Sequence, residues 1–524
     1  MSGNVQAQEE IIRKKLLIWV KEEHKTVKDV EGMQFPKFGK IISNEFPICK
    51  GLEFEIGDII QPMMNNYQKI CKTINETKIP AIVLMGDSDL LPDLFERINS
   101  KGTQLSKYQI YAATWSSSKF ELSSEFHELV KANRDRYDAM LEGNGTLEEY
   151  DPIEFMSKKE LDTFEIAFGL GKYLCKTWPH LFGNSNKETQ VESIGFTLLN
   201  CCVGMKNKDA KLLNNKLKDR IGKDGIDIFL KKILETIGYI DNILGKYSQF
   251  KSNSRKNTTN KTLQTEFQIV SIITSVFLLK FAEIERDEYD NIKHIEYTFD
   301  KVNATWKKEQ EKIFKMNIER IYIMENLQRR WTGTGDKKMD LILTNTEYYI
   351  RNIKKDEFVK MLETWYENLN NERSEFKKIA TTKESELLVI AALYLPIFSA
   401  DQQMGGAKYD IEHLATQGMM KKHLDRFEGK LRLPISSIAN LCLLPECVNR
   451  SKKDKTLYMD SEYLKKTNMS LEVIEQNYSF TKEEDLLWIE DTKSTMEEFQ
   501  DSYMNFIDKR FNTIKMKLVD SLRF

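Results

Sequence analysis

Residues 409–414 read Tyr409-Asp410-Ile411-Glu412-His413-Leu414, and apolar and polar side chains alternate along them. Such alternation is typical of a β-strand with one face toward a core. Successive strand residues point to opposite faces, so Glu412 and His413 can share one site only at a bend or at a strand end. Gly405-Gly406 before the stretch and Gly418 after it leave room for such a bend.

Among six histidines, only His413 has acidic and asparagine residues at a spacing that suggests catalysis. Asn440 follows 27 residues later, and Asn449 comes nine residues after that, within Asn449-Arg450-Ser451-Lys452. A surface or packing role is the favoured interpretation for the other five histidines, which are His24, His127, His180, His294 and His423.

The residue types around His413 suit the hydrolysis of a phosphodiester. That reaction needs a base to activate water, a divalent cation to neutralise the phosphate, and a scaffold that holds the base. Histidine titrates near neutral pH and is a natural base, which points to His413. The Glu412 carboxylate and the Asn449 carbonyl are hard oxygen ligands suited to magnesium. We expect Asn440 to fix the loop that presents His413; the alternative is that these residues follow one another by chance.

The order D-[VI]-[DE]-H, then an asparagine, then N-R-x-K nine residues later resembles the HNH nuclease domain, including the version in RNA-guided CRISPR nucleases. The resemblance implies a ββα-metal hairpin in which His413 is the general base and Glu412 and Asn449 hold Mg²⁺ or Mn²⁺. It also implies a structural role for the first asparagine and a place near the phosphate for Lys452. Thr416 departs from the pattern, because many relatives have proline there. The alternative is a decayed nuclease that keeps the fold.

The distribution of charge also bears on nucleic-acid binding. The net charge is −2, so a nucleic-acid partner would have to be bound by a local basic patch. Between Met419 and Lys455 there are nine lysines and arginines but only four acids. We expect this stretch to contact the DNA backbone and the binding to weaken steeply with salt. The expected contacts are Lys421, Lys422, Lys452, Lys453 and Lys455.

Cysteine content and hydropathy point to a cytoplasmic chain. Seven scattered cysteines without a secretory signal predict free thiols in a reducing compartment. Cys442 and Cys447 lack CxxC spacing, so two strand or loop cysteines are favoured over a zinc site. The most apolar window, Ile269–Phe281, is too short and too polar to span a membrane.

Outside the His413 stretch the sequence predicts a mainly α fold. Apolar residues recur with the helical period of 3.6 through a large middle region. The clearest predicted helices are Lys159–Trp178, Ile226–Leu244, Leu263–Arg286 and Val302–Arg329. The pattern breaks at Trp331–Asp336. The last fifty residues return to helix, with an apolar face formed by Met496, Phe499, Tyr503, Phe506 and Phe511.

The N-terminal hundred residues read as mixed α and β. A helix is predicted over Ile11–Val20, a buried strand over Ile79–Met85 and a helix over Leu90–Ile98. Residues 94–106, LFERINSKGTQLS, resemble a signature of GmrSD-type restriction proteins. In these a ParB/sulfiredoxin-like domain precedes a helical region and a C-terminal HNH domain.

These patterns divide the chain into four regions. They are a partial ParB-like α/β domain (1–115), a helical domain (116–395), an HNH module embedded in helices (396–470) and C-terminal helices (471–524). The D-G-Q-Q-R-type motif that the family associates with nucleotides is missing, and Asp401-Gln402-Gln403 comes too late to replace it. Gly169-Leu170-Gly171-Lys172 lacks P-loop spacing. Nucleotide dependence is therefore not supported for this chain alone, although a separate subunit could supply the missing half-domain.

Two hypotheses follow. The preferred one is a metal-dependent HNH DNA endonuclease of bacterial anti-phage defence, with modified DNA as a candidate trigger. The alternative is a non-catalytic DNA- or partner-binding subunit whose HNH fold is vestigial. A scaffold for a partner that carries the ParB-like half is compatible with both, and it predicts an exposed apolar surface near residues 1–50.

Overall fold

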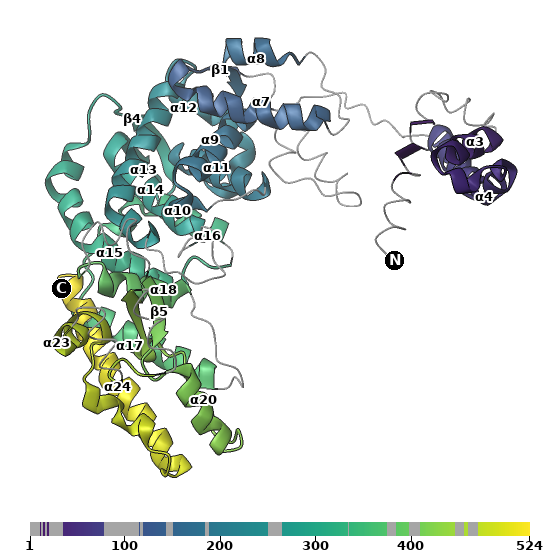
Figure 1. The fold of residues 1–524 in the computed structure, drawn as a ribbon. Helices are drawn as coiled ribbons and strands as arrows, with labels where there is room; N and C mark the ends of the chain where they lie inside the picture. Colours follow the sequence, from purple (N-terminus) through teal and green to yellow (C-terminus); the bar gives the residue numbers. More distant parts are fainter. Residues whose placement is uncertain are drawn as a thin grey trace. The chain divides into compact units, whose positions relative to one another are not determined.

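The computed structural model describes most of the chain in ten segments. They are residues 35–77, 119–142, 150–183, 188–249, 265–333, 335–374, 384–397, 409–445, 455–459 and 470–524, together with Ile11, Lys14, Lys15, Ile18, Trp19 and Trp115. The fold is mainly α, as the sequence predicts (Figure 1). The chain divides into two compact units, Met1–Gly86 and Asp87–Phe524.

The first unit contains a pair of packed helices. These are α3 (Phe35–Glu45) and α4 (Glu53–Glu76), joined by the short turn η1 (Pro47–Cys49). A Cβ atom on Gly39 would overlap the carbonyl oxygen of Glu53, so this glycine permits their close approach. The described residues within the predicted helix 11–20 are helical, whereas the predicted strand 79–85 and the motif at 94–106 lie outside the described residues.

The second unit begins with a large helical region. Its longer helices are α7 (His127–Glu142), α9 (Thr163–Thr177), α11 (Glu188–Cys202), α13 (Ile226–Gln249), α14 (Glu266–Phe281), α15 (Glu311–Leu327), α17 (Lys355–Ser374) and α18 (Glu384–Tyr394). Shorter helices connect them: α8 (Pro152–Lys158), α10 (Pro179–Phe182), α12 (Leu213–Ile221) and α16 (Gly335–Thr344). The helices predicted to begin at Ile226 and Val302 are confirmed as α13 and α15, the latter preceded by a π-helical turn, η5 (Trp306–Gln310).

Gly171, part of the Gly-rich stretch that lacks P-loop spacing, lies within α9 and serves helix packing. Added Cβ atoms on Gly171 and Gly195 would overlap the carbonyl oxygens of Val191 and Ala167. The backbones of α9 and α11 therefore touch each other directly at these two positions.

Two predicted helices are wrong at one end, because strands replace helical turns there. Glu160–Asp162 form β2, which pairs antiparallel with β1 (Lys119–Glu121). The Asp162 carboxylate accepts a hydrogen bond from the backbone N–H of Glu165, and the Glu165 carboxylate accepts one from the backbone N–H of Asp162, at 2.9 and 2.7 Å. This reciprocal cap fixes the start of α9 at Thr163.

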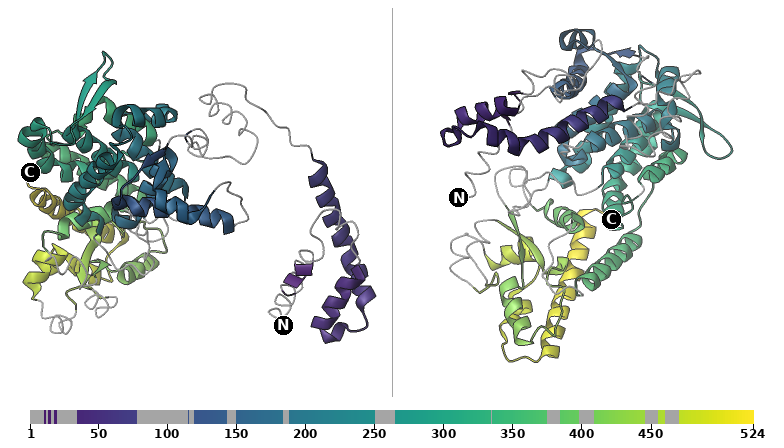
Figure 2. Two further views of the ribbon diagram at one scale, coloured as in Figure 1. Left: turned by 90° about the horizontal axis from the view of Figure 1, so that it is seen from above. Right: turned by 90° about the vertical axis from the view of Figure 1, so that its right-hand side faces the viewer.

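The second correction concerns the end of the predicted helix Leu263–Arg286. The helix ends at Phe281, and β3 (Ala282–Arg286) then pairs antiparallel with β4 (Ile292–Tyr297). The carboxylate of Asp287 accepts hydrogen bonds from the backbone N–H groups of Tyr289 and Asn291, each at 2.9 Å, and so closes the turn. Figure 2 shows this hairpin projecting from the surrounding helices.

The predicted break at residues 331–336 follows the end of α15 at Leu327. Trp331 is buried, and its indole N–H donates to the carboxylate of the buried Glu325 at 2.7 Å. Arg351 also reaches this carboxylate, at 3.2 Å. The turn is therefore anchored by a buried acid whose charge is balanced by arginine.

The C-terminal part of the second unit surrounds a two-stranded hairpin. In chain order it contains β5 (Tyr409–His413), α20 (Gln417–Arg426), η7 (Ile438–Asn440), β6 (Leu441–Pro445), α23 (Leu471–Ile474), η8 (Glu475–Ser479), η9 (Glu483–Glu490) and α24 (Met496–Ser521). The predicted apolar face of α24 is buried except at Met496, which is 41% exposed because it is the first residue of the helix. His423 of α20 stacks on Phe499 near the beginning of α24.

One continuous apolar core runs from Trp115 to Leu522, so the hairpin and the helical region share buried surface. The most apolar helix, α14, is buried from Gln268 to Leu278. None of the helices in the described segments has the length and apolarity required to cross a bilayer.

Candidate active site

The predicted strand around His413 is present as β5, and it forms an antiparallel pair with β6. In the register of this pair, His413 lies opposite Leu441, and Glu412 lies opposite Cys442. From Leu441 to Leu444, β6 is fully buried, whereas Ile411, Glu412 and His413 are half-buried. The hairpin therefore leaves β5 accessible along its edge, and β6 anchors it to the core.

The regular pairing of β5 decides how Glu412 and His413 are directed. Residues opposite each other in an antiparallel pair share a face, so Glu412 is on the face of Cys442 and His413 on the face of Leu441. His413 is the last residue of the strand, and the chain turns immediately afterwards. The strand end that could bring the two side chains to one site is thus present, but the strand itself places them on opposite faces.

Asn440 is completely buried and joins the two sides of this turn. Its side-chain N–H₂ donates to the carbonyls of Ala415 and Ile435 at 3.1 and 2.8 Å. Its side-chain oxygen accepts from the backbone N–H of Ala415 at 2.8 Å, and its backbone oxygen accepts from Leu414 at 2.9 Å. Asn440 therefore binds the two residues that directly follow His413.

Two residues that sequence reasoning missed contact the His413 ring. The hydroxyl of the buried Ser436 lies 3.1 Å from Nε2. The amide nitrogen of Gln417, the first residue of α20, lies 3.3 Å from the same atom. Gln417 is four residues from His413 and could have been considered, but nothing in the sequence around Ser436 marks it as a partner of a residue 23 positions earlier.

Thr416, where the related pattern often has proline, begins α20. Its hydroxyl accepts from the backbone N–H of Met419 at 3.4 Å, which is the usual role of an N-cap threonine. The departure from the pattern thus leaves the helix start capped directly after the turn held by Asn440.

The predicted DNA-binding lysines are only partly within the described residues. Lys421 and Lys422 lie on α20 and are exposed, and Lys455 is also exposed. The remaining predicted site residues, Asn449, Lys452 and Lys453, lie outside the described residues. The structure therefore places two predicted contact lysines on the helix that begins four residues after His413.

Two other histidines have defined surroundings. His423 is buried on α20, stacks on Phe499 with 4.3 Å between ring centroids, and donates to the Ile489 carbonyl at 2.8 Å. Burial lowers its pKa, which fits the predicted packing role. His180 lies 2.6 Å from the carboxylate of Asp241, an acidic partner 61 residues away that sequence spacing did not suggest.

Only one of the two expected metal ligands, Glu412, lies within the described residues. Within the described segments, no three His, Cys, Asp or Glu residues are arranged to hold a metal ion. Of the expected pair of oxygen ligands, Glu412 is half-buried on β5, and Asn449 lies outside those segments. Cys442 is a buried free thiol, and Cys447, its partner in the zinc alternative, is also outside them.

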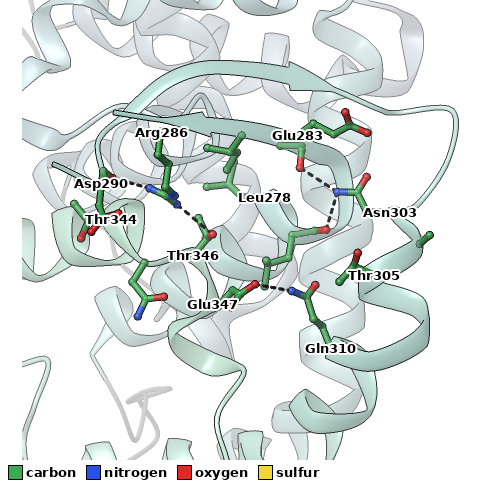
Figure 3. Close-up of a pocket in the computed structure, with 15 residues that line it drawn as sticks. Leu278, Glu283, Arg286, Asp290, Asn303, Thr305, Gln310, Thr344, Thr346 and Glu347 are labelled. Atoms are coloured by element: carbon green, nitrogen blue, oxygen red, sulfur yellow. Dashed lines mark hydrogen bonds between the residues drawn. The ribbon is translucent and has the colours of Figure 1, made fainter. Parts of the chain in front are cut away.

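A separate cavity of about 880 Å³ lies beside the β3–β4 hairpin (Figure 3). Arg286 donates there to the carbonyls of Asp290 and Leu343, each at 2.7 Å. Gln310, on the π-helical turn η5, donates to the carboxylate of Glu347 at 3.0 Å. These polar groups bond to one another and to the backbone, so they account for the architecture of the hairpin base.

Neither the family models nor the curated proteins nor the solved structures that were compared with this chain gave a match. The assignment of the site therefore rests on the residues and geometry of the hairpin.

Proposed function

We propose that the chain is a metal-dependent endonuclease that hydrolyses phosphodiester bonds in DNA, with His413 as the general base. The observation that carries this proposal is the bonding of Asn440 to Ala415 on both its N–H and its C=O. A general base must be held in place before it can act, and this arrangement fixes the chain directly after His413. The residue order that resembles the HNH domain is thus accompanied by a turn that Asn440 holds in place directly after His413.

The reaction follows from the groups around the ring. Water attacks phosphorus, the new P–O bond forms, and the bond to the leaving oxygen breaks, so that this oxygen departs as an alkoxide and takes up a proton from solvent water. His413 accepts the proton of the attacking water, while the Ser436 hydroxyl, 3.1 Å from Nε2, orients the ring. A divalent cation bound by Glu412 and Asn449 would neutralise charge on the phosphate. Lys452 would add a positive charge nearby.

DNA would approach along α20. Lys421 and Lys422 are exposed there, and phosphate contacts of this kind make affinity fall with salt. Replacing both by alanine should weaken duplex binding and reduce the salt slope by about two. Lys354 and Lys355, an exposed neighbouring pair at the start of α17, provide the matched control. Equal losses in both double variants would count against α20 as the DNA-contacting helix.

The direct test is cleavage of supercoiled plasmid and phage DNA by the full chain with Mg²⁺ or Mn²⁺. Wild type should nick or cut, and His413→Ala should lose about a hundredfold or more of this activity while still binding DNA. His294→Ala, at an exposed position of β4, should cut like wild type. If wild type does not cut, with or without nucleotide, the nuclease proposal is wrong for the isolated chain.

A second candidate function is a non-catalytic subunit that binds DNA or a protein partner through a vestigial HNH fold. The observation that favours it is apolar surface in the first unit, where Ile48 is 89% exposed and Phe54 73%. Leu52, between them, is also exposed. Contiguous apolar surface is a feature of interaction sites, and these three residues lie within seven positions of one another along the chain. Cleavage that depends on His413 would exclude the vestigial form of this hypothesis.

A further inference from the structure

The segment 434–440 carries both residues that fix the surroundings of His413. Ser436 contacts the imidazole at 3.1 Å, and Asn440 bonds to the turn after the strand. Only Ile438–Asn440, at the end of the segment, form a short helical turn, and the residues before it lie outside regular structure. Its position must therefore be set by contacts with other parts of the chain.

The C-terminal helix α24 supplies two such contacts. The hydroxyl of Tyr503 donates to the carbonyl of Pro434 at 2.9 Å, at the beginning of the segment. The guanidinium of Arg510 donates to the carbonyls of Ala439 and Ile438 at 2.7 and 3.3 Å, at its end. Tyr503 and Arg510 are seven residues apart, so they lie on the same face of the helix, two turns from each other. Together they hold both ends of the segment.

Arg510 is an unusual choice for this position, because it is only 2% exposed. No carboxylate among the described residues forms an ion pair with it, and burial lowers its pKa. Its Nε donates to the carbonyl of Ser479 at 2.6 Å, whereas its Nη2 has no partner among those residues. A buried unpaired charge is costly, and a methionine of similar length would avoid that cost. Methionine, however, would leave three carbonyl oxygens without this donor.

We propose that Tyr503 and Arg510 are positioning residues for the reaction at His413, an inference that rests on the proposed nuclease function. They act through the segment 434–440 and do not touch the substrate. Arg510 serves because its rigid planar fork of donors reaches several carbonyls at once, which a lysine cannot do. The last helix of the chain is therefore part of the catalytic scaffold.

The test compares Arg510→Met, Arg510→Lys and Tyr503→Phe with matched controls in the helical region. Arg220, in the helical region, also donates to backbone carbonyls, those of Val203 and Gly204, so Arg220→Met is the control for arginine. Tyr297→Phe removes a tyrosine–carbonyl bond of the same kind, to Cys202 at 2.6 Å. Each variant is examined for thermal unfolding, DNA affinity, kcat and KM of plasmid nicking, and hydrogen exchange.

We expect Arg510→Met to lower kcat per folded molecule about tenfold or more, while DNA affinity changes less than twofold. The amides of Leu414 and Ala415, which bond to Asn440, should exchange faster in the same variant. Arg510→Lys should recover part of the kcat, and Tyr503→Phe should show a smaller loss. Arg220→Met and Tyr297→Phe should lower the melting temperature but leave kcat and these two amides unchanged.

A kcat per folded molecule and an amide exchange equal to those of wild type in Arg510→Met would overturn the inference and make Arg510 an ordinary core residue. Failure of the nuclease proposal is recognised separately, because wild type itself would then not cut. In that event hydrogen exchange still decides about the helix. Faster exchange at Leu414 and Ala415 in Arg510→Met than in Arg220→Met supports the positioning of the loop, and equal exchange rejects it.

Discussion

The helical region and the hairpin region of the second unit are held together in different ways. In the helical region, α9 and α11 touch through Gly171 and Gly195, and their backbone groups bond within each helix. In the hairpin region, side chains donate to backbone carbonyls that no regular element satisfies, as Asn440, Tyr503 and Arg510 do. The contact between α9 and α11 therefore depends on shape, whereas contacts around the hairpin depend on hydrogen bonds.

The difference has a physical cause. A helix pairs its own N–H and C=O groups, so only its apolar surface needs partners. In a two-stranded sheet, most of the chain that connects the strands lacks the backbone hydrogen bonds of regular structure. Buried backbone N–H and C=O groups are costly when they have no hydrogen-bond partner. The same kind of substitution should therefore alter stability in the helical region, but alter the geometry around His413 in the hairpin region.

Replacing Asn440 should give the largest effect. Asn440→Ala leaves the N–H and C=O of Ala415 and the C=O of Ile435 without this partner, which should cost about 3 kcal/mol of stability. Plasmid nicking per folded molecule should fall about a hundredfold, because the turn after His413 is released. Denaturant unfolding and single-turnover nicking measure the two losses.

Asn133 offers a matched test of the comparison. It is equally buried in α7 and donates to the carbonyls of Leu129 and Glu165 at 3.0 and 2.7 Å. Asn133→Ala should lower stability by about 1 to 3 kcal/mol but leave nicking per folded molecule unchanged. A loss of nicking in Asn133→Ala equal to that in Asn440→Ala would remove the distinction between the two regions.

Gly195→Ala should give the next largest effect, and on stability alone. The added Cβ would overlap the backbone oxygen of Ala167, which cannot move without separating α9 from α11, so we expect a loss of about 3 kcal/mol. Gly238, inside α13, is the control, because nothing lies within 4 Å of its added Cβ. Gly238→Ala should stabilise the protein by about 0.5 to 1 kcal/mol through helix propensity. Thermal unfolding of both variants distinguishes an effect on the contact between α9 and α11 from the general effect of replacing glycine by alanine inside a helix.

The sequence allowed the main features of the fold to be predicted because helical periodicity is local. The helices α13 and α15 follow from the spacing of their own apolar residues, although α15 begins later than the predicted Val302, and the strand at Tyr409–His413 follows from its alternation. The errors arose where distant pairing replaced helix. Ala282–Arg286 continues an apolar helix in sequence, but it becomes a strand because Ile292–Tyr297 returns beside it.

The candidate site shows the same limit. His413 and Asn440 could be selected by residue type and spacing, since the chemistry restricts both. Ser436, Tyr503 and Arg510 could not, because the hydrogen-bond partners of each come from a distant part of the sequence. An arginine within an apolar helix face is ordinarily assigned to the surface, and only the structure reveals its burial.

Stability of the helical region should also depend on pH through Asp162. Burial and the neighbouring Glu165 raise the pKa of this carboxyl to about 7. Its folded pKa exceeds its unfolded one, so the stabilisation is complete below about pH 4 and is lost as pH rises toward 7. Asp162→Asn keeps a cap acceptor without the charge. Between pH 5 and 7 wild type should lose about 1 to 2 kcal/mol relative to Asp162→Asn. If the melting temperatures of wild type and Asp162→Asn change by the same amount between pH 5 and 7, the raised pKa does not belong to Asp162.

Ser436→Ala should have the smallest effect on kcat among the substitutions expected to slow nicking. It tests the orientation of the His413 ring separately from the support of the segment 434–440. The hydroxyl contributes one hydrogen bond to the imidazole, and Gln417 still contacts the ring, so kcat should fall only about fivefold. Ser437→Ala is the neighbouring control: Ser437 accepts from the backbone N–H of Ala439 and caps the turn before Asn440. It should lower stability by about 1 kcal/mol with little change in kcat. If Ser437→Ala slows nicking more than Ser436→Ala does, the position of the loop matters more to the reaction than the orientation of the ring, and the hairpin region acts chiefly through its backbone.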